Sequence, residues 1–195
     1  MGRSRLPRPD PARRRHLLYG AGCFRVAWYA INSEPFRLML DAVEAAADGG
    51  TYTDVASLRG EQPPPGTPVP WDAAEALRFA ASHHYVTGYH GAEESAARVH
   101  GYILAAVPGA APLLDGVRDD ILGRPAVVFD ERWRTPTVVA LARGMYQSRD
   151  FTGMPALADE LQEAGCDDPK VLEHARNPAG VHARGCWLVD LILGK

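Results

Sequence analysis

The chain has 195 residues, enough for one large domain or two small ones. Apolar residues make up 46% of it and charged residues 23%, so the composition supplies a core and excludes general disorder. The longest apolar stretches fall short of the roughly 18 residues that cross a bilayer, which predicts no transmembrane helix and no membrane partner. Three cysteines are too few, and an odd number, for the disulfide framework of a small secreted protein. We therefore expect a cytoplasmic protein.

The formal net charge of −3 is unevenly distributed along the chain. Residues 1–16 hold six arginines and one aspartate, a charge of +5, whereas the rest of the chain carries 15 basic and 23 acidic residues, or −8. This pattern predicts a basic arm over residues 1–16 ahead of an acidic body. Such an arm can bind nucleic acid through Arg13, Arg14 and Arg15. The alternative, which is the commoner outcome, is a solvated tail that folds back on the acidic body.

Helix signals recur through residues 17–123, the predicted N-terminal helical region. A helix start precedes it at Asp10 and Pro11, because the aspartate can cap free N–H groups and proline fits the first turn. Apolar residues then follow at helical spacing as far as Ile31. Further helices are predicted over residues 34–47, 72–88, 92–107 and 112–121. Residues 61–70 hold five prolines and predict a stiff Pro-rich loop.

Residues 131–195 are predicted to form a compact C-terminal unit of four short helices. The first three start at Thr135, Thr152 and Asp168, and the last spans about residues 183–193. Residues 125–130 are the one strand-like run, and without a partner strand they predict an extended connector. The expected fold class is therefore all-α, a multi-helix array with a compact C-terminal unit of four short helices.

Four residues of this C-terminal unit are of the types that bind zinc: Cys166, His174, His182 and Cys186. The last two are four residues apart, so on a helix they would share one face, while turns could bring the first two to them. A structural zinc ion here would hold together four helices whose own core is thin. The sequence lacks the C-x2–4-C pair of a zinc knuckle. The alternative interpretation is two buried thiols and two histidines that bond turn carbonyls.

A second polar group consists of His83, His84, His90, Glu93 and Glu94, and it could supply a general acid–base pair. The chain has no H-E-x-x-H motif, phosphate-binding loop or Gly-x-Ser-x-Gly elbow beside it. An enzyme that uses this group is therefore only an alternative hypothesis.

Several C-terminal motifs are specific enough to indicate relatives. They are residues 133–144 (WRTPTVVALARG), 154–159 (MPALAD), 164–167 (AGCD) and 182–195 (HARGCWLVDLILGK). These motifs resemble the C-terminal segment of a family of uncharacterised bacterial proteins. The N-terminal half is similar more loosely, around Cys23, Arg25 and Trp28. The resemblance implies a helical protein with a variable alanine-rich middle, and it implies no activity and no catalytic residue.

The function that the sequence favours is a non-enzymatic interaction or regulatory module with a protein partner, its C-terminal unit clamped by zinc. This hypothesis has two grounds. The sequence shows no recognisable set of catalytic residues, and helix starts and ends follow one another closely after Trp133. Nucleic-acid binding through Arg13, Arg14 and Arg15 is the second hypothesis, and an enzyme is the third.

Overall fold

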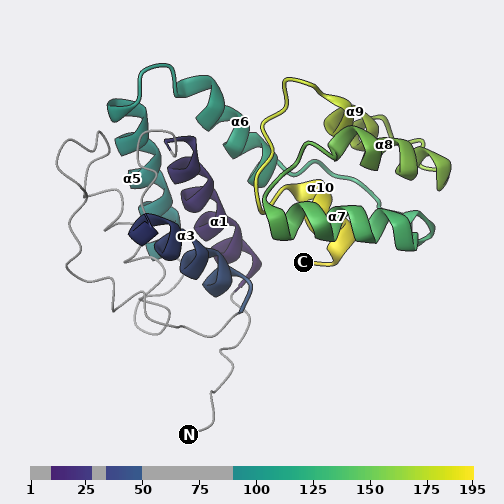
Figure 1. Ribbon diagram of the computed structural model, residues 1–195, viewed down its shortest axis with the longest axis horizontal. Coiled ribbons are helices and arrows are strands. Elements are labelled where there is room, and N and C mark those ends of the chain that lie inside the picture. The colour runs from purple at the N-terminus through teal and green to yellow at the C-terminus, as the bar shows by residue number, and fades with distance from the viewer. Residues whose placement is uncertain (1–9, 28–33, 50–89) are drawn as a thin grey trace, which may run out of the picture. The chain divides into compact units, whose positions relative to one another are not determined.

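The computed structural model of the chain describes residues 10–27, 34–49 and 90–195. Within them the element order is α1 (Pro11–Val26), α3 (Glu34–Ala47), α5 (His90–Ala106), α6 (Ala111–Ile121), the 3₁₀ turn η1 (Glu131–Trp133), α7 (Pro136–Ser148), α8 (Met154–Glu163), α9 (Pro169–Arg176) and α10 (Trp187–Leu193), as Figure 1 shows. These residues contain no strand, which confirms the all-α fold class. The predicted Pro-rich loop at 61–70 and the helix at 72–88 lie outside the described residues.

The chain divides into two compact units, Met1–Asp115 and Gly116–Lys195. The second unit was predicted to begin at residue 131, but it also includes the end of α6 and the connector that follows. Residues 123–130 of this connector are neither helix nor strand, as expected for an extended link. No helix in the described ranges has both the length and the apolar character that a membrane span requires.

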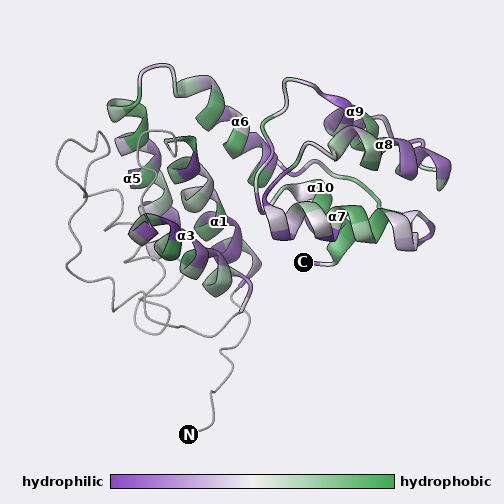
Figure 2. Ribbon diagram, in the orientation of Figure 1, coloured by the Kyte–Doolittle hydropathy of each residue, from purple (hydrophilic) through white to green (hydrophobic). Residues whose placement is uncertain are grey.

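The described part of the first unit is built around α1, which contacts both α3 and α5 (Figure 1). Asp10 caps α1 as predicted, because its carboxylate accepts a hydrogen bond from the Arg13 N–H at 3.2 Å. The apolar residues spaced along α1 are buried, among them Leu17 and Phe24. Figure 2 shows polar and apolar residues mixed along each of these helices, as is usual for helices that bury one face.

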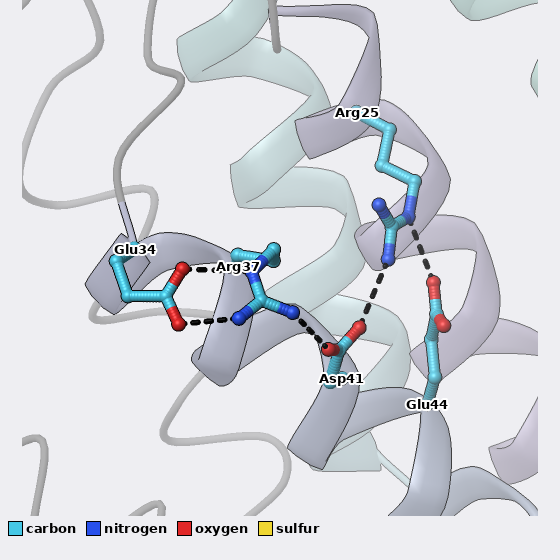
Figure 3. A network of polar contacts seen from close by, with 5 residues as sticks. All are labelled: Arg25, Glu34, Arg37, Asp41 and Glu44. Atoms are coloured by element: carbon cyan, nitrogen blue, oxygen red, sulfur yellow. Dashed lines mark hydrogen bonds and ion pairs between the residues drawn. The ribbon is translucent and has the colours of Figure 1, made fainter.

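A network of charged side chains joins α1 to α3, as Figure 3 shows. The Arg25 Nε donates to Glu44 Oε1 at 2.8 Å, and the Arg25 guanidinium lies 3.6 Å from Asp41. On α3, Arg37 pairs with Glu34 and lies 3.6 Å from Asp41. Only 1% of the Glu44 side chain is exposed, whereas about half of Arg37 is. The Arg25–Glu44 pair is therefore the buried link of the network.

Arg25→Ala should destabilise the first unit by about 3 kcal/mol, because it leaves the buried Glu44 carboxylate without this guanidinium. Arg37→Ala is the matched control, and it should barely move the unfolding midpoint because its partners are more exposed. Denaturant unfolding followed by circular dichroism measures both variants. Equal losses of stability would show that burial of Glu44 does not distinguish the two arginines.

The second unit has one apolar core, to which all four of its last helices contribute. α7 contacts α8 and α10, and α9 contacts the same two helices. Two of the predicted helix starts form as caps: Thr135 Oγ1 accepts from the Val138 N–H at 3.2 Å, and Asp168 Oδ1 accepts from the Lys170 N–H at 2.8 Å. The largest fully buried side chains of this core are Met154, Leu157, Leu161 and Leu188.

Two predicted helix starts in the second unit are displaced. Thr152 bonds Asp150 with both its N–H and its hydroxyl, and α8 begins two residues later at Met154. The last helix begins at Trp187, four residues later than predicted, because Gly185 has a φ of +103° and the Cys186 N–H closes a turn on the Ala183 carbonyl. His182 and Cys186 therefore do not share a helix face, which corrects the predicted arrangement.

Candidate metal centre

Four side chains with metal-binding atoms meet in the second unit. Asp120 comes from the last turn of α6 and His174 from α9. His182 lies in the connecting segment, residues 177–186, which links α9 to α10, and Cys186 ends this segment. Each side chain offers one ligand atom, and these four atoms all lie within 4.8 Å of one another. The cluster therefore joins three separate parts of the unit.

The shortest distances within the cluster are close to those of tetrahedral coordination. His182 Nδ1 lies 3.0 Å from Asp120 Oδ1, and His174 Nε2 lies 3.2 Å from the same oxygen. His174 Nε2 is also 3.3 Å from Cys186 Sγ. Ligands bound to zinc at about 2.0–2.3 Å are separated by roughly 3.3–3.8 Å along the edges of the tetrahedron. Small outward shifts of these atoms would therefore make room for an ion.

Three of the four predicted ligands belong to this cluster, and the fourth, Cys166, does not. Cys166 follows the end of α8, where Gly165 has a φ of +89° and the Cys166 N–H bonds the Leu161 carbonyl. This turn places the thiol in the apolar core, where the residue is 2% exposed. Asp120, which the sequence did not single out, takes the fourth position. The corrected set is Asp120, His174, His182 and Cys186.

The connecting segment passes close to α6 at Gly116, which lies one helical turn before Asp120. A Cβ atom at residue 116 would lie 2.7 Å from Val181 Cγ2, so only a residue without a side chain fits there. Beyond this contact, the Ala183 N–H donates to Asp120 Oδ2 at 2.9 Å. The glycine and the carboxylate thus fix the connecting segment against the same face of α6.

The two imidazoles are positioned by ring contacts and by a second glycine. The His174 ring lies 4.5 Å from the Trp187 ring and 4.9 Å from the His182 ring, measured between centroids. A Cβ at Gly180 would lie 2.9 Å from His182 Nε2, so this glycine leaves room for the imidazole. The connecting segment therefore carries His182 into the cluster without the helix that the sequence predicted.

Asp120 sets the electrostatics of the cluster. Burial by itself would raise the pKa of this carboxyl, but hydrogen bonds from His174 and His182 hold the pKa below its ordinary value. Burial, and then the charge of Asp120, raise the pKa of the Cys186 thiol well above its usual range. The cluster without a cation therefore holds an ionised carboxylate beside a protonated thiol.

This arrangement does not activate Cys186 as a nucleophile. In a cysteine–histidine–aspartate relay the two ring nitrogens have different partners, whereas here His174 Nε2 faces both the thiol and the carboxylate. The Cys186 side chain is also completely buried, so a substrate does not reach it. A divalent cation would instead favour the thiolate. The charges of the ion, the thiolate and the carboxylate would then cancel in this buried place.

The three arginines predicted to bind nucleic acid, Arg13, Arg14 and Arg15, lie in α1 and not in a separate arm. Residues 11–16, part of the predicted basic arm, are the first turns of α1. Arg13 and Arg14 are both buried, and Arg14 Nε bonds Asp48 Oδ1 at 3.1 Å. Arg15 is half-buried. Arg13 and Arg14 therefore pack within the first unit and are not exposed as a basic arm would be.

The predicted acid–base group is described only in part. His83 and His84 lie outside the described residues, and His90 is the first residue of α5. Glu93 and Glu94 are exposed on α5, and Glu94 pairs with Arg98 one turn along at 2.6 Å. Both glutamates therefore lie on the solvated face of a helix.

Comparisons of the chain with models of protein families, with curated proteins and with solved structures find no match. The interpretation of the cluster accordingly rests on its own geometry.

Gly116→Ala should destabilise the second unit by about 1–3 kcal/mol, because the added methyl group overlaps the Val181 side chain. Gly144→Ala on α7 is the matched control: a Cβ there meets nothing within 4 Å, so helix propensity should stabilise the unit by roughly 0.5–1 kcal/mol. Denaturant unfolding measures both changes.

The double variant Gly116→Ala/Val181→Gly should be more stable than the sum of the two single changes predicts, because it removes the Val181 Cγ2 and Cβ atoms that would lie 2.7 and 2.8 Å from the added methyl group. A Gly116→Ala protein as stable as the parent would contradict the close approach of the connecting segment to α6.

Proposed function

We propose that this protein is a non-enzymatic interaction or regulatory module whose C-terminal unit binds one zinc ion through Asp120, His174, His182 and Cys186. The observation that carries the proposal is the convergence of a carboxylate, two imidazoles and a thiol from three parts of the unit within 4.8 Å. Four protein ligands are the number that structural zinc sites use.

The chemistry of the donors favours zinc over the common hard cations. Magnesium and calcium prefer sites made of oxygen atoms, whereas this cluster offers one carboxylate, two imidazole nitrogens and one sulfur. Imidazole and thiolate are the ligands that zinc takes most often in proteins. A divalent ion also balances one carboxylate and one thiolate, so the loaded site carries no net charge in its buried surroundings.

The closed form of the cluster supports a module rather than an enzyme. A catalytic zinc keeps a coordination position open for water or substrate. Here four protein side chains are present, and even His174, the most accessible of them, is only 19% exposed. The proposal favours a protein partner over nucleic acid, because Arg13 and Arg14 are buried. It also includes a reducing, cytoplasmic setting, since Cys23, Cys166 and Cys186 are all free thiols.

The metal content of the purified protein tests this proposal directly. Elemental analysis should find about one equivalent of zinc in the parent chain, and much less in Asp120→Ala and His174→Ala, because each variant removes a ligand. Cys166→Ala is the matched control: it removes a buried thiol outside the cluster and should retain the ion. Circular dichroism of each variant shows whether the helices are intact.

Cobalt substitution gives a second measurement of the same site. The cobalt-loaded parent protein should show the visible absorption of tetrahedral cobalt and a thiolate-to-cobalt band that Cys186→Ala removes and Cys166→Ala keeps. Zinc below about a tenth of an equivalent after incubation with the ion would reject the site.

A further inference from the structure

We infer that the zinc ion is a reversible ligand that orders the connecting segment, residues 177–186, and that the helices of the second unit fold without it. This inference rests on the proposed zinc site and concerns how the ion acts there. It assigns the unit a metal-responsive element, in which a divalent ion of the zinc type governs one surface segment.

The helices of the second unit have a core that does not depend on the cluster. Buried apolar side chains from α7, α8, α9 and α10 form this core, and among the proposed ligands only Cys186 belongs to it. Side-chain caps at Thr135 and Asp168 start α7 and α9 independently of the cluster. Removal of the ion therefore leaves the main source of stability in place.

The Asp120 carboxylate keeps its hydrogen-bond donors without an ion, although His182 Nε2 is buried without a hydrogen-bond partner among the described residues. Asp120 accepts from the Ala183 N–H, and both imidazoles lie within hydrogen-bond distance of its Oδ1 atom. An ionised carboxylate is tolerated in a buried place when several donors face it. Loss of the ion thus exposes no uncompensated charge that would force the unit to unfold.

Coordination of an ion would restrict the connecting segment more than any other part of the unit. Its own backbone hydrogen bonds are short-range turns, such as Gly180 N–H to Asn177 carbonyl at 3.0 Å and Cys186 N–H to Ala183 carbonyl at 2.9 Å. Asp120 links it to α6, and Arg184 stacks on Tyr146 at 4.5 Å. Coordination would add bonds from His182 and Cys186 to an ion held also by α6 and α9, which restricts the segment at both places.

Access to the cluster is consistent with exchange of the ion. The His174 side chain is 19% exposed, whereas Asp120 and His182 are 1% and 7% exposed. His174 is therefore the proposed ligand that lies nearest to solvent. A single thiolate also makes this set less sulfur-rich than the Cys₄ and Cys₃His sites typical of structural zinc.

Hydrogen exchange of the full chain, measured by mass spectrometry with and without zinc, tests the inference. One equivalent of zinc should slow exchange about tenfold or more in peptides that cover residues 177–186 and the end of α6. Exchange in α7 and α8 and the far-ultraviolet circular dichroism should stay the same. Magnesium at the same concentration is the control ion, and Asp120→Asn, which keeps the size of the side chain, should weaken the response.

The outcomes separate this inference from the proposed function. If zinc binds but its removal by a chelator abolishes the helical signal, the ion is an obligatory structural element and the reversible role is wrong. If zinc binds and exchange in the connecting segment is unchanged, the segment does not respond and the inference again fails. If the protein takes up no zinc at all, the proposed function and the inference both fall.

Discussion

The buried carboxylate of Asp120 is the interaction on which the second unit's arrangement depends. It is 1% exposed, and an ionised group in such a place is stable only when donors surround it. His174 supplies one from α9, and His182 and the Ala183 N–H supply two from the connecting segment. One side chain on α6 therefore links α6 and α9 to a segment that has no helix or strand of its own. Gly116 allows this, because the absence of a side chain there lets Val181 approach α6.

Two of the donors that stabilise the carboxylate, His174 Nε2 and His182 Nδ1, are also atoms of a kind that zinc binds. Without a cation, these two nitrogens lie within hydrogen-bond distance of the carboxylate. A divalent ion would bind them through their lone pairs, and the Cys186 thiol would lose its proton and become a thiolate beside a charge of opposite sign. The proposed zinc-bound state would therefore require positions of the helices similar to those observed. On that proposal the unit would keep its fold while the order of the connecting segment changes.

The first unit uses a buried charge differently. Glu44 of α3 faces Arg25 of α1, a strong cation with no metal-binding lone pair, so that contact can join helices but cannot become a metal site (Figure 3). Arg14 of α1 forms a second pair with Asp48, the residue that follows the end of α3. Arg14, one of the arginines that the sequence assigned to nucleic-acid binding, therefore contributes to the packing of the first unit. Its long aliphatic stem explains how it can be buried while its charged end remains paired.

Interactions between residues close together in the sequence could be predicted from the sequence alone. Thr135 and Asp168 start helices because a side-chain oxygen bonds an N–H two or three residues later, and the apolar spacing along α1 and α7 settles which faces are buried. Three residues of the candidate metal cluster, His174, His182 and Cys186, could also be predicted from their residue types. Tertiary structure decided that Asp120 joins them, because it lies 62 residues before His182 and meets it only through the packing of α6. It also placed Cys166 in the core and delayed the start of the last helix to Trp187, since turns at Gly165 and Gly185, rather than helical spacing, direct the chain there.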